Sequence, residues 1–99
     1  MEKYSGQKVY MGGETWVVPP LSLRQLRENY ETIVTPVTSG SIEDVIVSRL
    51  PIILMAMQRN YPDLTEDKLL DMLDANTLLP TFFAVAGGSG LEAAKPGEV

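Results

Sequence analysis

The chain has 99 residues, of which 13 are Asp or Glu and 8 are Lys or Arg, so its formal net charge is −5. This length suits one domain, and the acidic balance argues against binding nucleic acid or an anionic membrane, because both contacts rely on basic side chains. Cysteine and histidine are absent, which excludes disulfides, thiol nucleophiles, and the commonest general base and metal ligand.

The N-terminal residues predict a β-hairpin. Strand-forming residues stand on both sides of Gly12-Gly13, and two glycines supply the positive φ angles of a tight hairpin turn. With a two-residue loop, Met11 faces Glu14 and Val9 faces Trp16. The apolar side chains of one face are then Val9, Met11, Trp16 and Val18. A lone hairpin is marginally stable in water, so this face is expected to cover the helices or another copy of the chain.

A first helix is expected to begin at Ser22, because Ser22 and Gln25 have the spacing of a capping box. Its apolar residues recur at helical spacing and are expected to face the core: Leu23, Leu26, Tyr30, Ile33 and Val34. Arg24 and Arg27 are interpreted as a solvated helix face rather than a ligand-binding pair. A loop is expected over residues 35–40.

A second helix is expected to begin at Ser41, with Asp44 as its capping-box acid. The main apolar stripe of this helix consists of Ile42, Ile46, Leu50, Ile53 and Met57. Val47, Leu54 and Met55 lie outside that stripe, and a small domain cannot easily surround one helix. We therefore interpret these three residues, together with Trp16, as a partner-binding or subunit surface. A charged residue at Leu54 or Met55 is expected to remove binding with little cost in folding.

Pro51 lies inside the second apolar pattern. A proline in a helix interior removes one backbone hydrogen bond, so we expect Pro51 either to kink this helix or to start a new one after a break near residues 49–50.

Residues 60–63 predict a turn, and Thr65 is expected to cap the next helix. In that helix the inward side chains are expected to be Leu69, Leu70 and Leu73, and the outward ones Asp67, Asp71 and Asp74. A last short helix is expected over residues 78–86, capped by Asn76 or Thr77 and ended by Gly87-Gly88.

These elements predict an α+β fold that is mostly α, an N-terminal β-hairpin followed by a bundle of about four short helices. Residues 1–88 are expected to form one domain, and residues 89–99 a disordered tail.

Three motifs have a simpler interpretation than a ligand site. The acids between residues 63 and 74 approach a calcium-loop spacing, but Lys68 occupies the glycine position and Asp74 the position of the closing Glu. The glycines at 87–90 lack the lysine of a phosphate loop. Met55, Met57 and Met72 suit either an adaptable groove or core filling. We expect no cofactor, no metal and no catalytic residues, although a Ser–Lys or carboxylate mechanism stays formally open.

Three segments, in order, carry a family resemblance. They are residues 13–26 (GETWVVPPLSLRQL), residues 59–67 (RNYPDLTED) with Leu70-Asp71 and Asn76 following, and the stretch from Leu79-Pro80 to Leu91. Together they resemble the small tail assembly chaperones of long-tailed bacteriophages and prophages. Residues 36–57 contribute little to this resemblance, and Pro51 departs from it.

The resemblance implies a non-enzymatic chaperone that binds the phage tape-measure protein, helps tail-tube subunits polymerise around it and is absent from the finished particle. Many such chaperones are made in two lengths by a translational frameshift. The long, helical tape-measure protein suits recognition of a helix in a groove. The surplus apolar surface also predicts a homo-oligomer.

Two other functions stay open at this point. One is a minor structural tail or head–tail completion protein that remains in the particle, and the other is a small acidic regulatory binding module. Apolar runs far shorter than the ~20 residues of a membrane span, and an N-terminus without a signal-peptide pattern, lead us to expect the host cytoplasm.

Overall fold

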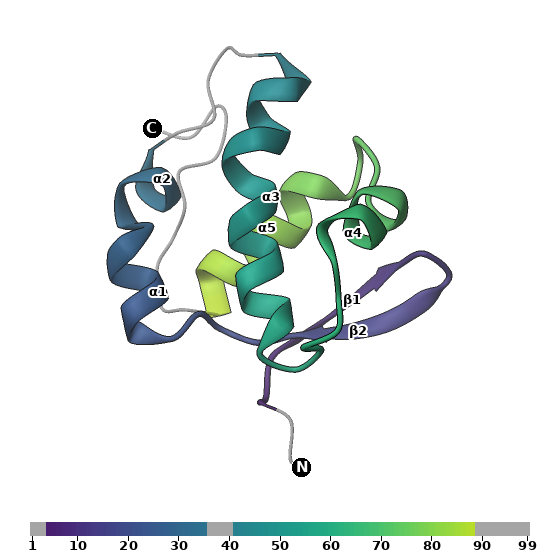
Figure 1. Cartoon of the computed structure of the whole chain (residues 1–99), viewed down its shortest axis with the longest axis horizontal. Coiled ribbons are helices and arrows are strands. Elements are labelled where there is room, and N and C mark those ends of the chain that lie inside the picture. Colours follow the sequence, from purple (N-terminus) through teal and green to yellow (C-terminus); the bar gives the residue numbers. More distant parts are fainter. Residues whose placement is uncertain (1–3, 36–40, 89–99) are drawn as a thin grey trace.

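The computed structural model describes residues 4–35 and 41–88, and within them the chain forms one β-hairpin and five helices. The elements in chain order are β1 (Gln7–Met11), β2 (Glu14–Val18), α1 (Leu23–Glu28), α2 (Tyr30–Val34), α3 (Ile42–Gln58), α4 (Glu66–Met72) and α5 (Leu78–Gly88). Figure 1 shows α3 through the middle of the molecule, with α1 and α2 on one side, α4 on the other and α5 behind. The predicted α+β, mostly helical fold is confirmed. Residues 36–40 of the expected loop at 35–40, and the expected tail at 89–99, lie outside the described residues.

The hairpin has the predicted register, with Met11 opposite Glu14 and Val9 opposite Trp16. Gly12 and Gly13 have φ angles of 60° and 80°, which L residues with side chains rarely adopt. A Cβ atom on Gly12 would also lie 2.7 Å from Cγ of Met72. The turn therefore needs glycine at position 12 both for its backbone angle and for its close approach to the end of α4.

The predicted first helix is divided into α1 and α2 at Asn29. Ser22 and Gln25 form the expected capping box, but the Asn29 side chain donates to the Gln25 carbonyl at 2.8 Å and ends α1 there. The break interrupts the apolar stripe, so Leu23 is 84% exposed, Tyr30 is exposed and Ile33 is buried. The prediction that Leu23 and Tyr30 face the core is wrong.

Helix α3 begins after Ser41, whose hydroxyl accepts from the Asp44 amide at 3.2 Å, and continues unbroken through Pro51. The predicted new helix after residues 49–50 does not occur. Pro51 and Val47 are both exposed, so the Val47 carbonyl that loses its helical partner lies on the side of α3 that faces water. Water can satisfy that carbonyl, and the helix continues.

In the C-terminal half, Thr65 caps α4 as predicted, and its hydroxyl accepts from the Lys68 amide at 3.2 Å. The prediction that Leu70 faces inward is wrong, because this side chain is 43% exposed. The turn into α5 is held by the Asp74 carboxylate, which accepts from the amides of Asn76 at 2.8 Å and Thr77 at 3.0 Å. Helix α5 extends to Gly88, two residues beyond the predicted end.

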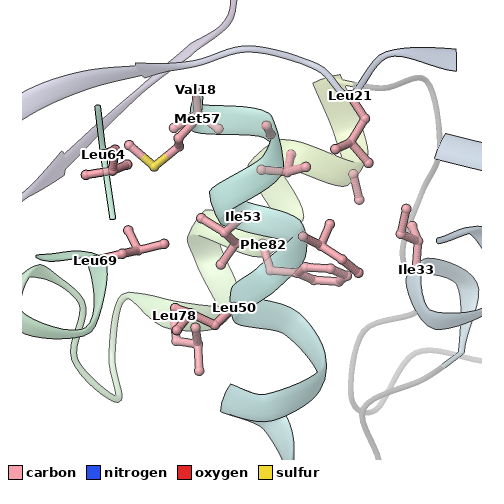
Figure 2. Close-up of a cluster of buried hydrophobic side chains, with 14 of the residues drawn as sticks. Val18, Leu21, Ile33, Leu50, Ile53, Met57, Leu64, Leu69, Leu78 and Phe82 are labelled. Carbon is pink, nitrogen blue, oxygen red and sulfur yellow. The ribbon is translucent and has the colours of Figure 1, made fainter. Parts of the chain in front are cut away.

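The core lies between α3 and α5 and is closed by the hairpin and the other helices (Figure 2). Its largest fully buried apolar side chains are Phe82, Ile33, Leu50, Ile52, Ile53, Met57, Leu69, Val18 and Val85. Strands β1 and β2 and helices α2 to α5 all contribute to the buried cluster, so the described residues share one hydrophobic core.

A buried cation, Arg49, attaches α2 to this core. Its guanidinium donates to the Thr35 carbonyl at 3.0 Å and the Thr32 carbonyl at 3.4 Å, and it lies 5.5 Å above the Phe82 ring. Desolvation lowers the pKa of Arg49 below its ordinary value. The carbonyls at the C-terminus of α2 carry partial negative charge, which explains why a cation is accepted there.

We predict that Ile53→Ala lowers the free energy of unfolding by about 2–5 kcal/mol, because a buried large-to-small change leaves a cavity. The matched control on the same helix is Val47→Ala, whose side chain is 70% exposed and whose removal should change stability by less than about 0.5 kcal/mol. Urea denaturation followed by far-UV circular dichroism measures both. Equal losses would contradict the assignment of the inner face of α3.

Candidate functional site

The four residues predicted to bind a partner differ in how far they are buried. Val47 is 70% exposed on α3, whereas Leu54 and Met55 are half-buried and pack against the core. The Met55 sulfur also accepts a weak hydrogen bond from the Asn29 side chain at 3.5 Å, under the α1–α2 junction. Leu54 and Met55 therefore support the fold as well as any partner contact, and the expectation that they lie off the core is corrected.

Trp16 is half-buried on the inner face of the hairpin. Its indole N–H donates to the Met11 carbonyl at 3.1 Å, and its ring meets Tyr61 edge to face with centroids 4.8 Å apart. The Tyr61 hydroxyl in turn accepts from the Val17 amide at 2.9 Å. Trp16 and Tyr61 therefore hold the hairpin to the segment that follows α3.

An apolar cleft lies between the N-terminal half of α3, the end of α4 and the start of α5. Its volume is about 120 Å³, and it is lined by Ile42, Ile46, Leu70, Leu73, Asp74, Ala75 and Leu78. Two of its apolar side chains are well exposed, Ile42 at 55% and Leu70 at 43%. We call this feature the α3–α4–α5 cleft. Exposed apolar side chains gathered around a hollow are typical of a protein-binding surface.

The border of the α3–α4–α5 cleft is acidic. Asp74 is the one charged residue among those that line it. Asp67 and Asp71 of α4 stand three residues before and one residue after Leu70, and both are exposed. Within residues 4–35 and 41–88, neither Asp67 nor Asp71 forms an ion pair. The negative charge beside this cleft is therefore not neutralised by the described part of the chain.

A second hollow lies beside Trp16 and Tyr61. It has a volume of about 350 Å³ and is also lined by Asn60, Pro62, Asp63, Leu64 and Lys68. The Asn60 side chain there is already engaged with Tyr4, donating to its carbonyl at 2.9 Å and accepting from its amide at 2.6 Å. The Asn60 side chain thus serves to attach the N-terminal segment. We regard the α3–α4–α5 cleft as the better candidate site, because exposed apolar side chains gather around it.

Sequence reasoning missed the α3–α4–α5 cleft because it assigned Ile42, Ile46, Leu70 and Leu73 to the core. The signal that could have found it is position. Ile42 is the first residue of its helix, and Leu70 stands next to Asp71 in a helix of seven residues. An apolar residue at the end of a helix often lies beyond the element that covers the rest of the apolar stripe. Arg24 and Arg27 are exposed, as predicted, and border a shallow hollow with Leu23.

The described residues offer an apolar surface for contact at the α3–α4–α5 cleft. Among the residues that the structure describes, no three acidic side chains are grouped to hold a metal ion, and none of the helices has the length and apolar character of a membrane span. No family model, curated protein or solved structure matches the chain. The function must therefore be inferred from the surface itself and from the sequence resemblance.

We predict that Leu54→Glu lowers the free energy of unfolding by about 1–3 kcal/mol, because it places a carboxylate against the core cluster. Val47 lies on the same helix but its side chain is 70% exposed. Val47→Glu should therefore change the free energy of unfolding by less than about 0.5 kcal/mol. Chemical denaturation of the two purified variants measures both changes in the free energy of unfolding. If both variants are as stable as the parent chain, Leu54 is free for a partner as the sequence suggested.

We also predict that Tyr61→Phe costs about 1–2 kcal/mol of stability, since the part-buried Val17 amide loses its acceptor. Tyr30→Phe is the control, because the Tyr30 hydroxyl has no hydrogen bond among the described residues. Thermal unfolding followed by Trp16 fluorescence reports on the hairpin directly. If the Tyr61 variant unfolds at the same temperature as the control, this hydrogen bond contributes little to stability.

Proposed function

We propose that this protein is a non-enzymatic assembly chaperone that binds an apolar helical segment of a phage tape-measure protein and so helps assembly of the tail tube. The observation that carries the proposal is the α3–α4–α5 cleft, where Ile42 and Leu70 expose apolar surface around a hollow. Three helices border this hollow, which suits a partner that adds a further helix.

The overall charge supports the same role. A chaperone that covers apolar segments must itself stay soluble while it exposes apolar side chains. A net charge of −5 favours solubility and opposes non-specific binding to nucleic acid. Apolar contact provides attraction without a fixed register, which suits a protein that must bind its partner and later release it.

The identity of the partner rests on the sequence resemblance to tail assembly chaperones. Part of the resembling sequence forms the surroundings of the cleft, since Leu70, Asp71 and Asn76 belong to the second resembling segment. The segment at residues 13–26 instead forms β2 and the start of α1. The resemblance therefore covers both a structural part of the fold and one side of the candidate site.

We predict that Ile42→Gln and Leu70→Gln each reduce binding to a tape-measure fragment about tenfold, because each removes apolar area that the partner would cover. Both side chains are well exposed, so folding should be preserved. The control is Leu23→Gln, which removes an even more exposed apolar side chain on α1. Each variant is co-expressed with the tagged fragment, and the soluble complex is quantified after affinity capture.

Unchanged recovery with both cleft variants, or an equal loss with Leu23→Gln, would contradict the assignment of the cleft. Mass spectrometry of purified virions separates a chaperone from a structural tail protein, because a chaperone should be absent from the finished particle. Capture of a host factor in place of the tape-measure fragment would favour a regulatory binding module.

A further inference from the structure

We propose that the α3–α4–α5 cleft accepts one large apolar side chain from a partner helix whose flanking residues are lysine or arginine. This inference rests on the proposed function and specifies the chemistry of the segment that is bound. It depends on two independent properties of the cleft, its shape and its uncompensated negative charge.

The shape sets the number of side chains that enter. A cleft of about 120 Å³ is close in volume to an apolar cavity of about 150 Å³ that holds one benzene molecule. It therefore accepts a single side chain of the size of leucine, methionine or phenylalanine. The exposed parts of Ile42 and Leu70 extend this apolar surface on two sides. On the partner helix, residues three or four positions from the inserted side chain lie close enough to it to cover Ile42 and Leu70.

The charge sets what surrounds that side chain. Asp74 lines the cleft. Asp67 stands three residues before Leu70, on the same side of α4, and Asp71 stands one helical turn after Asp67. The one basic residue of α4, Lys68, lines the other hollow, beside Trp16. A partner with basic residues beside its apolar anchor would gain attraction here, whereas an acidic partner would be repelled.

The four arginines of the described chain are engaged elsewhere or stand on the other side of α3. Arg49 is buried and donates to α2 carbonyls, and Arg59 donates to the Pro20 carbonyl and lies above the Tyr4 ring. Arg24 and Arg27 stand on α1, which Figure 1 shows on the opposite side of α3 from α4. Within residues 4–35 and 41–88, Asp67 and Asp71 form no ion pair, so a basic partner would meet unpaired carboxylates here.

The same charge argues against a second copy of this chain as the occupant. A two-fold contact through the cleft would bring the same surface of both copies together. Asp67, Asp71 and Asp74 of one copy would then face the equivalent acids of the other, which is unfavourable. A basic amphipathic helix meets no such repulsion.

The test uses two fluorescein-labelled helical peptides of about five turns, long enough to be helical when bound. Both have the same apolar stripe with one central leucine, and they differ only in carrying lysine or glutamate beside that stripe. Fluorescence anisotropy with the full chain should give at least about tenfold tighter binding of the lysine peptide near 0.05 M salt. The difference should shrink by about 0.5 M salt, because exposed charges are screened.

Three variants locate the binding. Leu70→Gln should weaken binding of the lysine peptide about tenfold through lost apolar contact. The double change Asp67→Asn and Asp71→Asn should weaken it about fourfold to twenty-fivefold, from about two- to fivefold for each exposed ion pair. The control removes the same charge elsewhere, by Glu28→Gln and Glu31→Gln on α1 and α2, and should leave the affinity unchanged. Asp74 is left intact because it caps the turn into α5.

Equal affinity for the two peptides, or equal weakening by the two double variants, overturns the inference. Failure of both peptides to bind also overturns it, as does a dimer of the free chain that Leu70→Gln dissociates. If the two peptides bind equally but the tape-measure fragment still depends on Ile42 and Leu70, the chaperone proposal stands without this inference. If the lysine peptide binds as expected and the fragment does not, the inference stands and the tape-measure partner is wrong.

Discussion

The contact between the inner face of α3 and α5 is the interaction on which the rest of the structure depends. Leu50 and Ile53 of α3 and Phe82 and Val85 of α5 are almost wholly buried there. None of the other elements has enough apolar surface to form a core of its own, because the hairpin and the short helices each bury at most two side chains. They become stable by packing on this helix pair, which explains why a chain of 99 residues needs so long a central helix.

Polar contacts then fix how the smaller elements are placed. Arg49 holds the C-terminal carbonyls of α2, and Asn60 and Tyr61 hold the N-terminal segment and the hairpin. Each of these side chains satisfies backbone groups of a segment distant in sequence, where an unpaired group would be costly. Hydrophobic burial therefore sets which elements meet, and a few side-chain hydrogen bonds set their orientation.

The candidate site is a consequence of the same arrangement. Helix α3 is longer than its neighbours, and its first turns, with Ile42 and Ile46, extend to where α4 ends and α5 begins. The Ile42 side chain at that end of α3 is 55% exposed, and a hollow lies between the three helices. In the proposed function, the acidic residues of α4 would favour solubility and would also select the charge of the partner helix.

Local features of this protein were determined by the sequence alone. The Gly12-Gly13 turn set the hairpin register, and Ser22, Ser41 and Thr65 set the starts of three helices. These signals involve residues a few positions apart, so the physical cause and its effect lie in the same segment. The exposure of Asp67 and Asp71 followed in the same way from helical spacing.

What the tertiary structure decided was which side of each helix found a neighbour. Periodicity shows that Leu23, Ile42 and Leu70 belong to apolar stripes, but it cannot show where the packing partner ends, and all three are exposed. The unbroken course of α3 through Pro51 likewise depends on water reaching the Val47 carbonyl on an open face. The candidate cleft could not be predicted for this reason: it is bounded by three helices far apart in the sequence, and only their packing leaves apolar surface uncovered between them.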